Sequence, residues 1–125
     1  MNIPVRIVVS EERDVLTVKF SSSKCFELPS EYLRVFSPSA EVRGHGKGQE
    51  VLQYAKRTVS ISSLVQAGNY AIQIFFSDGH DSGIYSWDYL HDLGENYTDN
   101  WINYLSRLHE AGKSRDSDVQ VVKLL

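Results

Sequence analysis

Apolar residues at every second position mark the first third of the chain as rich in strands. Leu16, Val18 and Phe20 share one face, which is typical of a strand with one buried side. A serine-rich turn leads to residues 25–28, which continue the apolar face, so we predict a β-hairpin. An earlier strand is expected near residues 7–9.

The middle of the chain repeats this pattern. Residues 59–64 alternate cleanly, a weaker strand-like run covers residues 51–54, and residues 70–76 are apolar on both faces, as in the central strand of a sheet. The dipeptide Asp78-Gly79 then suits a tight hairpin turn, with a short return strand around residues 80–85.

Three helices are expected. A short one begins with Ser30 as its N-cap. Near the C-terminus, one helix follows Ser86 and stops at Gly94, and another is capped by Thr98 and ends at Gly112.

These elements predict an α+β domain over residues 1–112: a mainly antiparallel β-sheet with short helices, the C-terminal helix packed on one face. Residues 113–125 are expected to be a charged, flexible tail.

Composition narrows the function classes. The 125 residues include 42% hydrophobic and 23% charged ones, the mixture of an ordinary globular domain. A net charge of −3 argues against a nucleic-acid partner. No apolar run reaches the length of a membrane span and the N-terminus lacks a signal-peptide core, so we expect a cytoplasmic protein without a membrane partner. The single cysteine, Cys25, excludes an internal disulfide and a cysteine-rich zinc site.

Residues 39–50 form a glycine-rich stretch that we interpret as a loop. Gly46-Lys47-Gly48 matches neither a P-loop nor a dinucleotide-binding fingerprint. What remains is a set of basic residues suited to an anion or an acidic partner surface: Arg43, His45, Lys47, Lys56 and Arg57. The competing interpretation is a solvated loop of mixed charge, which is the commoner case.

The densest polar cluster is the segment 78–83. It is not a calcium loop, because Tyr89 stands where a bidentate glutamate is needed. It also lacks a nucleophile elbow and the histidine–carboxylate pattern of a non-haem iron site. Two interpretations stay open: a binding surface made by Asp78, Asp81 and Ser82, or a plain hairpin turn whose side chains cap backbone groups.

Residues 68–90, with 28–34 and 37–42, closely resemble the γ-butyrobetaine hydroxylase-like N-terminal domain, in particular through Asp78-Gly79-His80-Asp81-Ser82. The resemblance points to the stand-alone bacterial branch. Relatives form the N-terminal part of γ-butyrobetaine and trimethyllysine dioxygenases, and others are appended to Mrp-type ATPases that carry iron–sulfur clusters. The iron and 2-oxoglutarate site of the dioxygenases lies in a separate domain, so the resemblance implies a fold without a catalytic activity.

In the dioxygenase branch the domain binds a structural zinc through three cysteines and the histidine of this motif. The resemblance aligns those cysteines with Ser37, Ser39 and Val42, while His80 is retained. Serine and valine do not replace thiolate ligands, so we expect no zinc.

We therefore expect a non-catalytic accessory module without a cofactor, which binds an unknown protein partner; a homodimer is left open. Its predicted binding surface combines Arg43, His45 and Lys47 with Asp78, Asp81 and Ser82. The alternative is an accessory protein that binds iron or zinc, or serves iron–sulfur chemistry, through His80 with His45. An independent hydrolase or oxygenase lacks a complete catalytic set.

Overall fold

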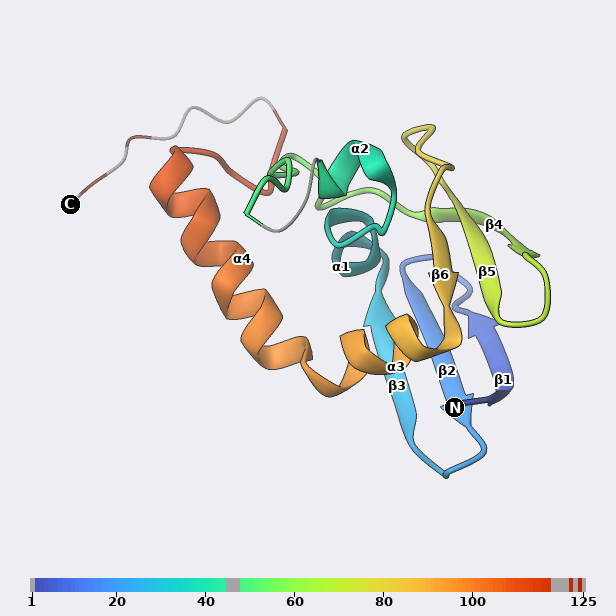
Figure 1. Cartoon of the computed structure of the whole chain (residues 1–125). Helices are drawn as coiled ribbons and strands as arrows, with labels where there is room; N and C mark the ends of the chain where they lie inside the picture. The colour runs from blue at the N-terminus through green and yellow to red at the C-terminus, as the bar shows by residue number, and fades with distance from the viewer. Residues whose placement is uncertain (1, 45–47, 118–121, 123, 125) are drawn as a thin grey trace.

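In the part of the chain that the structure describes, two small antiparallel sheets form the framework, accompanied by four helices (Figure 1). The structure is a computed structural model that describes residues 2–44, 48–117, 122 and 124. The first sheet has the order β1 (Pro4–Val9), β2 (Val15–Phe20), β3 (Cys25–Pro29), and the second has the order β4 (Ile61–Gln66), β5 (Ala71–Phe76), β6 (Ile84–Ser86). The helices are α1 (Ser30–Val35), α2 (Ala40–Arg43), α3 (Trp87–Glu95) and α4 (Tyr97–Ala111).

The predicted α+β class is confirmed, and so is the strand parity. Leu16 on β2 pairs with Leu28 on β3, and Val18 pairs with Phe26, so apolar residues face apolar residues across the hairpin. β5 occupies the centre of the second sheet, as its two apolar faces predict. The predicted single sheet is instead divided into two three-stranded ones.

The core joins the two sheets. It contains fully buried side chains from β2, α1, β5 and α3, among them Leu16, Leu33, Ile74 and Leu90. Burial of this apolar surface is the main stabilising contribution to the fold. None of the helices in the described ranges has the length and apolar character that a bilayer span requires.

Three predictions between residues 30 and 54 were wrong. Ser30 does not cap α1: it is the first helical residue, and its hydroxyl donates to the carbonyl of Val59 at 2.6 Å. The stretch 39–50 is not wholly irregular, because Ser39 accepts a hydrogen bond from the amide of Glu41 and thereby starts the short helix α2. The weak run at 51–54 forms no strand.

Helix ends near the C-terminus also differ from the prediction. Ser86 caps α3 as expected, by accepting from the amide of Tyr89. Gly94 does not end α3, however, and lies inside it. A Cβ at Gly94 would come within 2.3 Å of the Phe26 ring, so this glycine permits a close approach between helix and strand. Thr98 lies inside α4 and is not its cap, while Gly112 ends α4 in a left-handed conformation, as predicted.

α4 packs against α1 through aromatic rings. Tyr97 meets Tyr32 edge to face with 4.7 Å between ring centroids, and Tyr104 contacts Phe36 at 6.2 Å. Figure 1 accordingly shows α4 beside α1, on the side away from the two sheets.

Part of the segment after α4 contacts the domain. The guanidinium of Arg115 forms two hydrogen bonds, of 2.8 and 2.6 Å, with the buried carboxylate of Glu31 on α1. The carbonyl of Ser114 accepts a hydrogen bond from the amide of Ala55. The division at residue 112 therefore stays a prediction, but residues 114 and 115 are attached to the domain.

Candidate functional site

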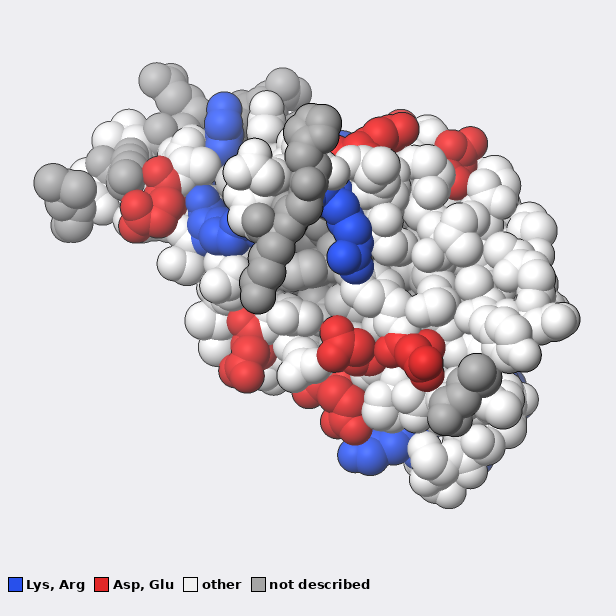
Figure 2. Space-filling model, viewed as in Figure 1, with Lys and Arg blue, Asp and Glu red and all other residues white. Residues whose placement is uncertain are grey.

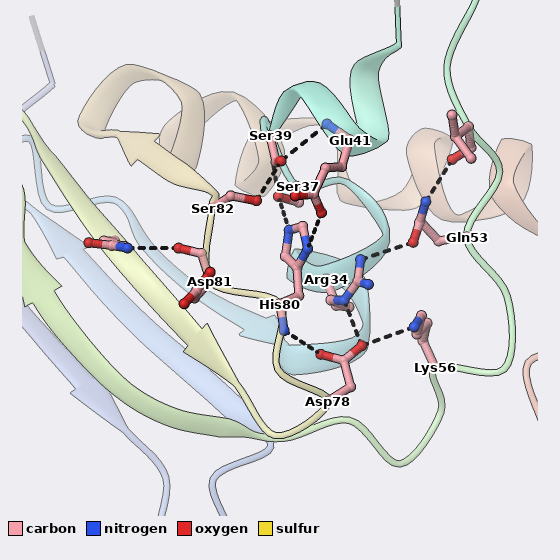
Figure 3. A network of polar contacts seen from close by, with 12 residues as sticks. Arg34, Ser37, Ser39, Glu41, Gln53, Lys56, Asp78, His80, Asp81 and Ser82 are labelled. Carbon is pink, nitrogen blue, oxygen red and sulfur yellow. Dashed lines mark hydrogen bonds and ion pairs between the residues drawn. The ribbon is translucent and has the colours of Figure 1, made fainter.

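The turn between β5 and β6 is the centre of a polar network, and we call residues 78–82 the β5–β6 turn (Figure 3). Within it, Asp78 connects three parts of the chain. Its Oδ2 accepts hydrogen bonds from Arg34 Nε on α1 and from Lys56 Nζ, both at 2.9 Å. Its Oδ1 accepts from the backbone amide of His80 at 3.2 Å, which closes the turn on itself.

The surroundings of Asp78 keep its carboxylate ionised. Partial burial raises the pKa, but the hydrogen bonds from Lys56, the His80 amide and Arg34 outweigh it and lower the pKa to about 2. At neutral pH the turn is therefore held by two charge-assisted contacts.

His80 fixes the other side of the turn to the segment that follows α1. Its side chain is only 3% exposed, so both ring nitrogens need partners inside the protein. Nε2 lies 2.8 Å from the hydroxyl of Ser37, and Nδ1 lies 3.5 Å from a carboxylate oxygen of Glu41 on α2. Burial, followed by the positive charge of Arg34, lowers the pKa of His80 below its ordinary value, so the imidazole is neutral at pH 7.

Serine hydroxyls complete the network. Ser39 Oγ and Ser82 Oγ are 2.7 Å apart, and the Ser39 amide donates to Ser37 Oγ at 3.3 Å. Gly83 packs directly over Ser37, where a Cβ would come within 2.6 Å of the hydroxyl. The turn is thus joined to α1, to α2 and to the connection between them.

Ser37 contacts His80, and His80 contacts Glu41, which is the arrangement of a nucleophile, a base and an orienting acid in a catalytic triad. A catalytic serine must meet its substrate, whereas Ser37 is 1% exposed and covered by Gly83. Its hydroxyl is also engaged with the Ser39 amide. The arrangement therefore fits a structural hydrogen-bond chain better than an acyl-transfer site.

The residues that the resemblance aligns with zinc-binding cysteines carry no thiolate. Ser37 and Ser39 lie in the network beside His80, but they supply neutral hydroxyls, and the buried Val42 supplies no donor atom. In the described part of the chain, no three His, Cys, Asp or Glu side chains are grouped so that they could hold a metal ion. His45 lies outside the described residues, so its pairing with His80 stays a prediction.

The described members of the predicted basic set, which are Arg43, Lys56 and Arg57, have separate partners. The guanidinium of Arg43 lies 5.1 Å from the centre of the Tyr89 ring on α3, Lys56 pairs with Asp78, and Arg57 pairs with Asp116. Figure 2 shows the Lys and Arg side chains of this face well separated from one another. Lys47 and His45 lie outside the described residues.

Of the predicted site residues, the structure joins Asp78, Asp81 and Ser82 in one turn, where the carbonyl of Asp81 accepts from Gln73. It gives Arg43 a different neighbour, Tyr89. Arg34 and Glu41 were missed, because both are distant in sequence from the turn and nothing in the pattern singles them out. Lys56 was predicted as part of a basic surface, but its pairing with Asp78 was not.

Comparisons with known proteins show the family of the chain. The family model described as gamma-butyrobetaine hydroxylase-like, N-terminal, matches residues 7–91. A search of curated proteins finds no match.

Three solved structures are similar to the chain. A protein whose structure was solved by NMR in solution is 46% identical, with a TM-score of 0.84, over 100% of this chain and 98% of that one. A second NMR structure is 40% identical, with a TM-score of 0.79, over 98% and 94%. A crystal structure of a DUF971-family protein of unknown function from Acidithiobacillus ferrooxidans is 33% identical, with a TM-score of 0.61, over 73% of this chain and 91% of that one. The family model spans more than half of the chain, and two of these structures are similar to it over nearly its whole length, so the chain belongs to the gamma-butyrobetaine hydroxylase-like N-terminal family.

Proposed function

We propose that this domain is a non-catalytic interaction module whose β5–β6 turn, together with Glu41, receives a protein partner. The observation that carries the proposal is the polar network around an exposed turn. Asp78 accepts a hydrogen bond from Arg34 on α1, while His80 is hydrogen-bonded to Ser37 and lies 3.5 Å from the carboxylate of Glu41 on α2. The chain belongs to a family that includes a protein of unknown function, and an accessory role fits this membership.

A turn held in this way favours binding because less conformational entropy is lost when a partner docks. The network engages Asp78 and His80 inside the protein, while other residues of the turn and of α2 also reach the surface. Asp81 and Ser82 are exposed, and the side chain of Glu41 is 73% exposed. Two carboxylates beside a hydroxyl favour a partner surface that presents lysine or arginine.

The same contacts support a role without chemistry on a substrate. The imidazole of His80 is buried and hydrogen-bonded to Ser37, and Asp78 is held by two cations. We infer no cofactor for this role.

Quantitative affinity capture from the native cells tests the proposal, with the wild-type chain, Asp81→Lys and Glu27→Lys as baits. Both substitutions reverse one exposed carboxylate, but Glu27 lies on β3, outside the network. A partner of the turn is recovered with wild type and with Glu27→Lys, and its recovery falls about tenfold with Asp81→Lys. The captured protein is then purified, and its Kd for the three chains is measured directly. Equal affinity for wild type and Asp81→Lys would contradict the proposed surface.

A further inference from the structure

A cavity of about 270 Å³ lies between α2, residues 50–53 and α4. Its apolar wall is formed by Val35 and Phe36 from the end of α1, by Val42 on α2 and by Leu52. Pockets that bind small molecules combine such an apolar wall with a few convergent polar groups.

The cavity is positively charged, although the chain carries a net charge of −3. Arg43 reaches it from α2 and Arg107 from α4, and Glu50 is the acidic residue in its lining. Two cations against one carboxylate leave an excess of one positive charge.

Two tyrosines frame the cavity without changing this balance. The hydroxyl of Tyr89 donates to the carbonyl of Phe36, and that of Tyr104 donates to the carbonyl of Gln53. Burial raises the pKa of both hydroxyls, that of Tyr104 to about 12, so both tyrosines are neutral at physiological pH. They therefore add no negative charge that would repel an anion.

We infer that this cavity binds a small organic carboxylate with an apolar body, held by Arg43 and Arg107. A guanidinium matches a carboxylate with two parallel hydrogen bonds, and a single negative charge balances the excess charge of the lining. The apolar body would lie against Val42 and Leu52. Ser37 of the polar network lines the cavity, but Glu41, Asp81 and Ser82 do not, so the ligand would not occupy the proposed protein-binding surface.

Two-dimensional ¹H–¹⁵N NMR titrations with sodium benzoate and with benzamide test the inference. The two probes have nearly the same shape, but only benzoate is charged. We expect saturable shifts with benzoate at the amides of residues 50–53 and of α4, and at least tenfold weaker binding of benzamide.

Arg107→Gln should weaken benzoate binding by about tenfold, while Arg6→Gln on β1, which makes the same charge change at an exposed position, should leave it unchanged. Leu52→Trp fills the cavity and keeps both arginines, so it should abolish the shifts, and it tests the cavity even if Arg107→Gln disturbs the fold. Equal binding of benzamide and benzoate, full binding by the Leu52→Trp chain, or no saturable shift up to about 20 mM benzoate would overturn the inference.

Discussion

α1 is fastened to distant parts of the chain on two sides, by two kinds of contact. On one side, Tyr32 packs against the rings of Tyr97 and Trp101 of α4. On the other side, Arg34 forms an ion pair with Asp78 of the β5–β6 turn, and Ser37, just after the helix, contacts His80. The aromatic side is stabilised by buried area, which depends little on pH. The contacts on the polar side depend on the direction of each hydrogen bond and on the ionisation of Asp78. They therefore fix the geometry of the turn more than they add stability.

Truncation of the aromatic side should have the largest effect. Tyr32 is fully buried, and its hydroxyl donates to the carbonyl of Leu93. Tyr32→Ala leaves a cavity and an unpaired carbonyl, so we expect the free energy of unfolding in urea to fall by about 3–5 kcal/mol at any pH near neutral.

The matched control is Tyr70→Ala, since Tyr70 is 58% exposed and the same atoms are removed. Its free energy of unfolding should change by no more than about 0.5 kcal/mol. If the free energy of unfolding fell by a similar amount in both variants, the burial of Tyr32 between α1 and α4 would not be the cause of the loss.

The polar side should give a smaller effect that depends on pH. Asp78→Asn removes the charge that faces Arg34 and Lys56, and at pH 7 we expect a loss of about 1–2 kcal/mol, reduced by the solvent exposure of the turn. The folded pKa of Asp78 is about 2, below its unfolded value, so its contribution is complete above about pH 4 and is lost as the pH falls towards 2. Urea unfolding of both chains between pH 2 and pH 7 measures the difference.

Asp81→Asn is the control in the same turn, because Asp81 makes no ion pair with any residue in the described ranges. The stability of this variant should stay close to that of wild type across the range. If the gap between wild type and Asp78→Asn stayed constant from pH 7 to pH 2, the charge of Asp78 would not be its cause.

Several features that depend on local sequence were predicted correctly, whereas several that depend on distant contacts were not. Alternation identifies β2 and β3 because each apolar residue reports its own burial, as Leu16 and Leu28 do. The prediction for Gly94 fails because the role of this glycine is set by the ring of Phe26, almost seventy residues earlier. The local sequence contains no sign of that contact.

The candidate site depends even more on contacts between residues that are distant in sequence. The Asp78–Ser82 segment is recognisable as a polar turn, but its partners Arg34, Glu41 and Lys56 are chosen by tertiary packing. The family resemblance brings Ser37 and His80 into one site, and the structure places them 2.8 Å apart. The cavity between α2 and α4 has no local signal at all, because its two arginines are 64 residues apart in sequence.

The central claim is that polar contacts with α1, α2 and the connection between them hold the exposed β5–β6 turn in one conformation. Backbone ¹⁵N relaxation of residues 79–82 tests it most directly. We predict order parameters of about 0.85 in the wild type, as in the strands, and values below about 0.6 in Ser37→Ala, which removes the hydroxyl partner of His80. A wild-type turn already below about 0.6, or an unchanged turn in Ser37→Ala, would contradict the claim.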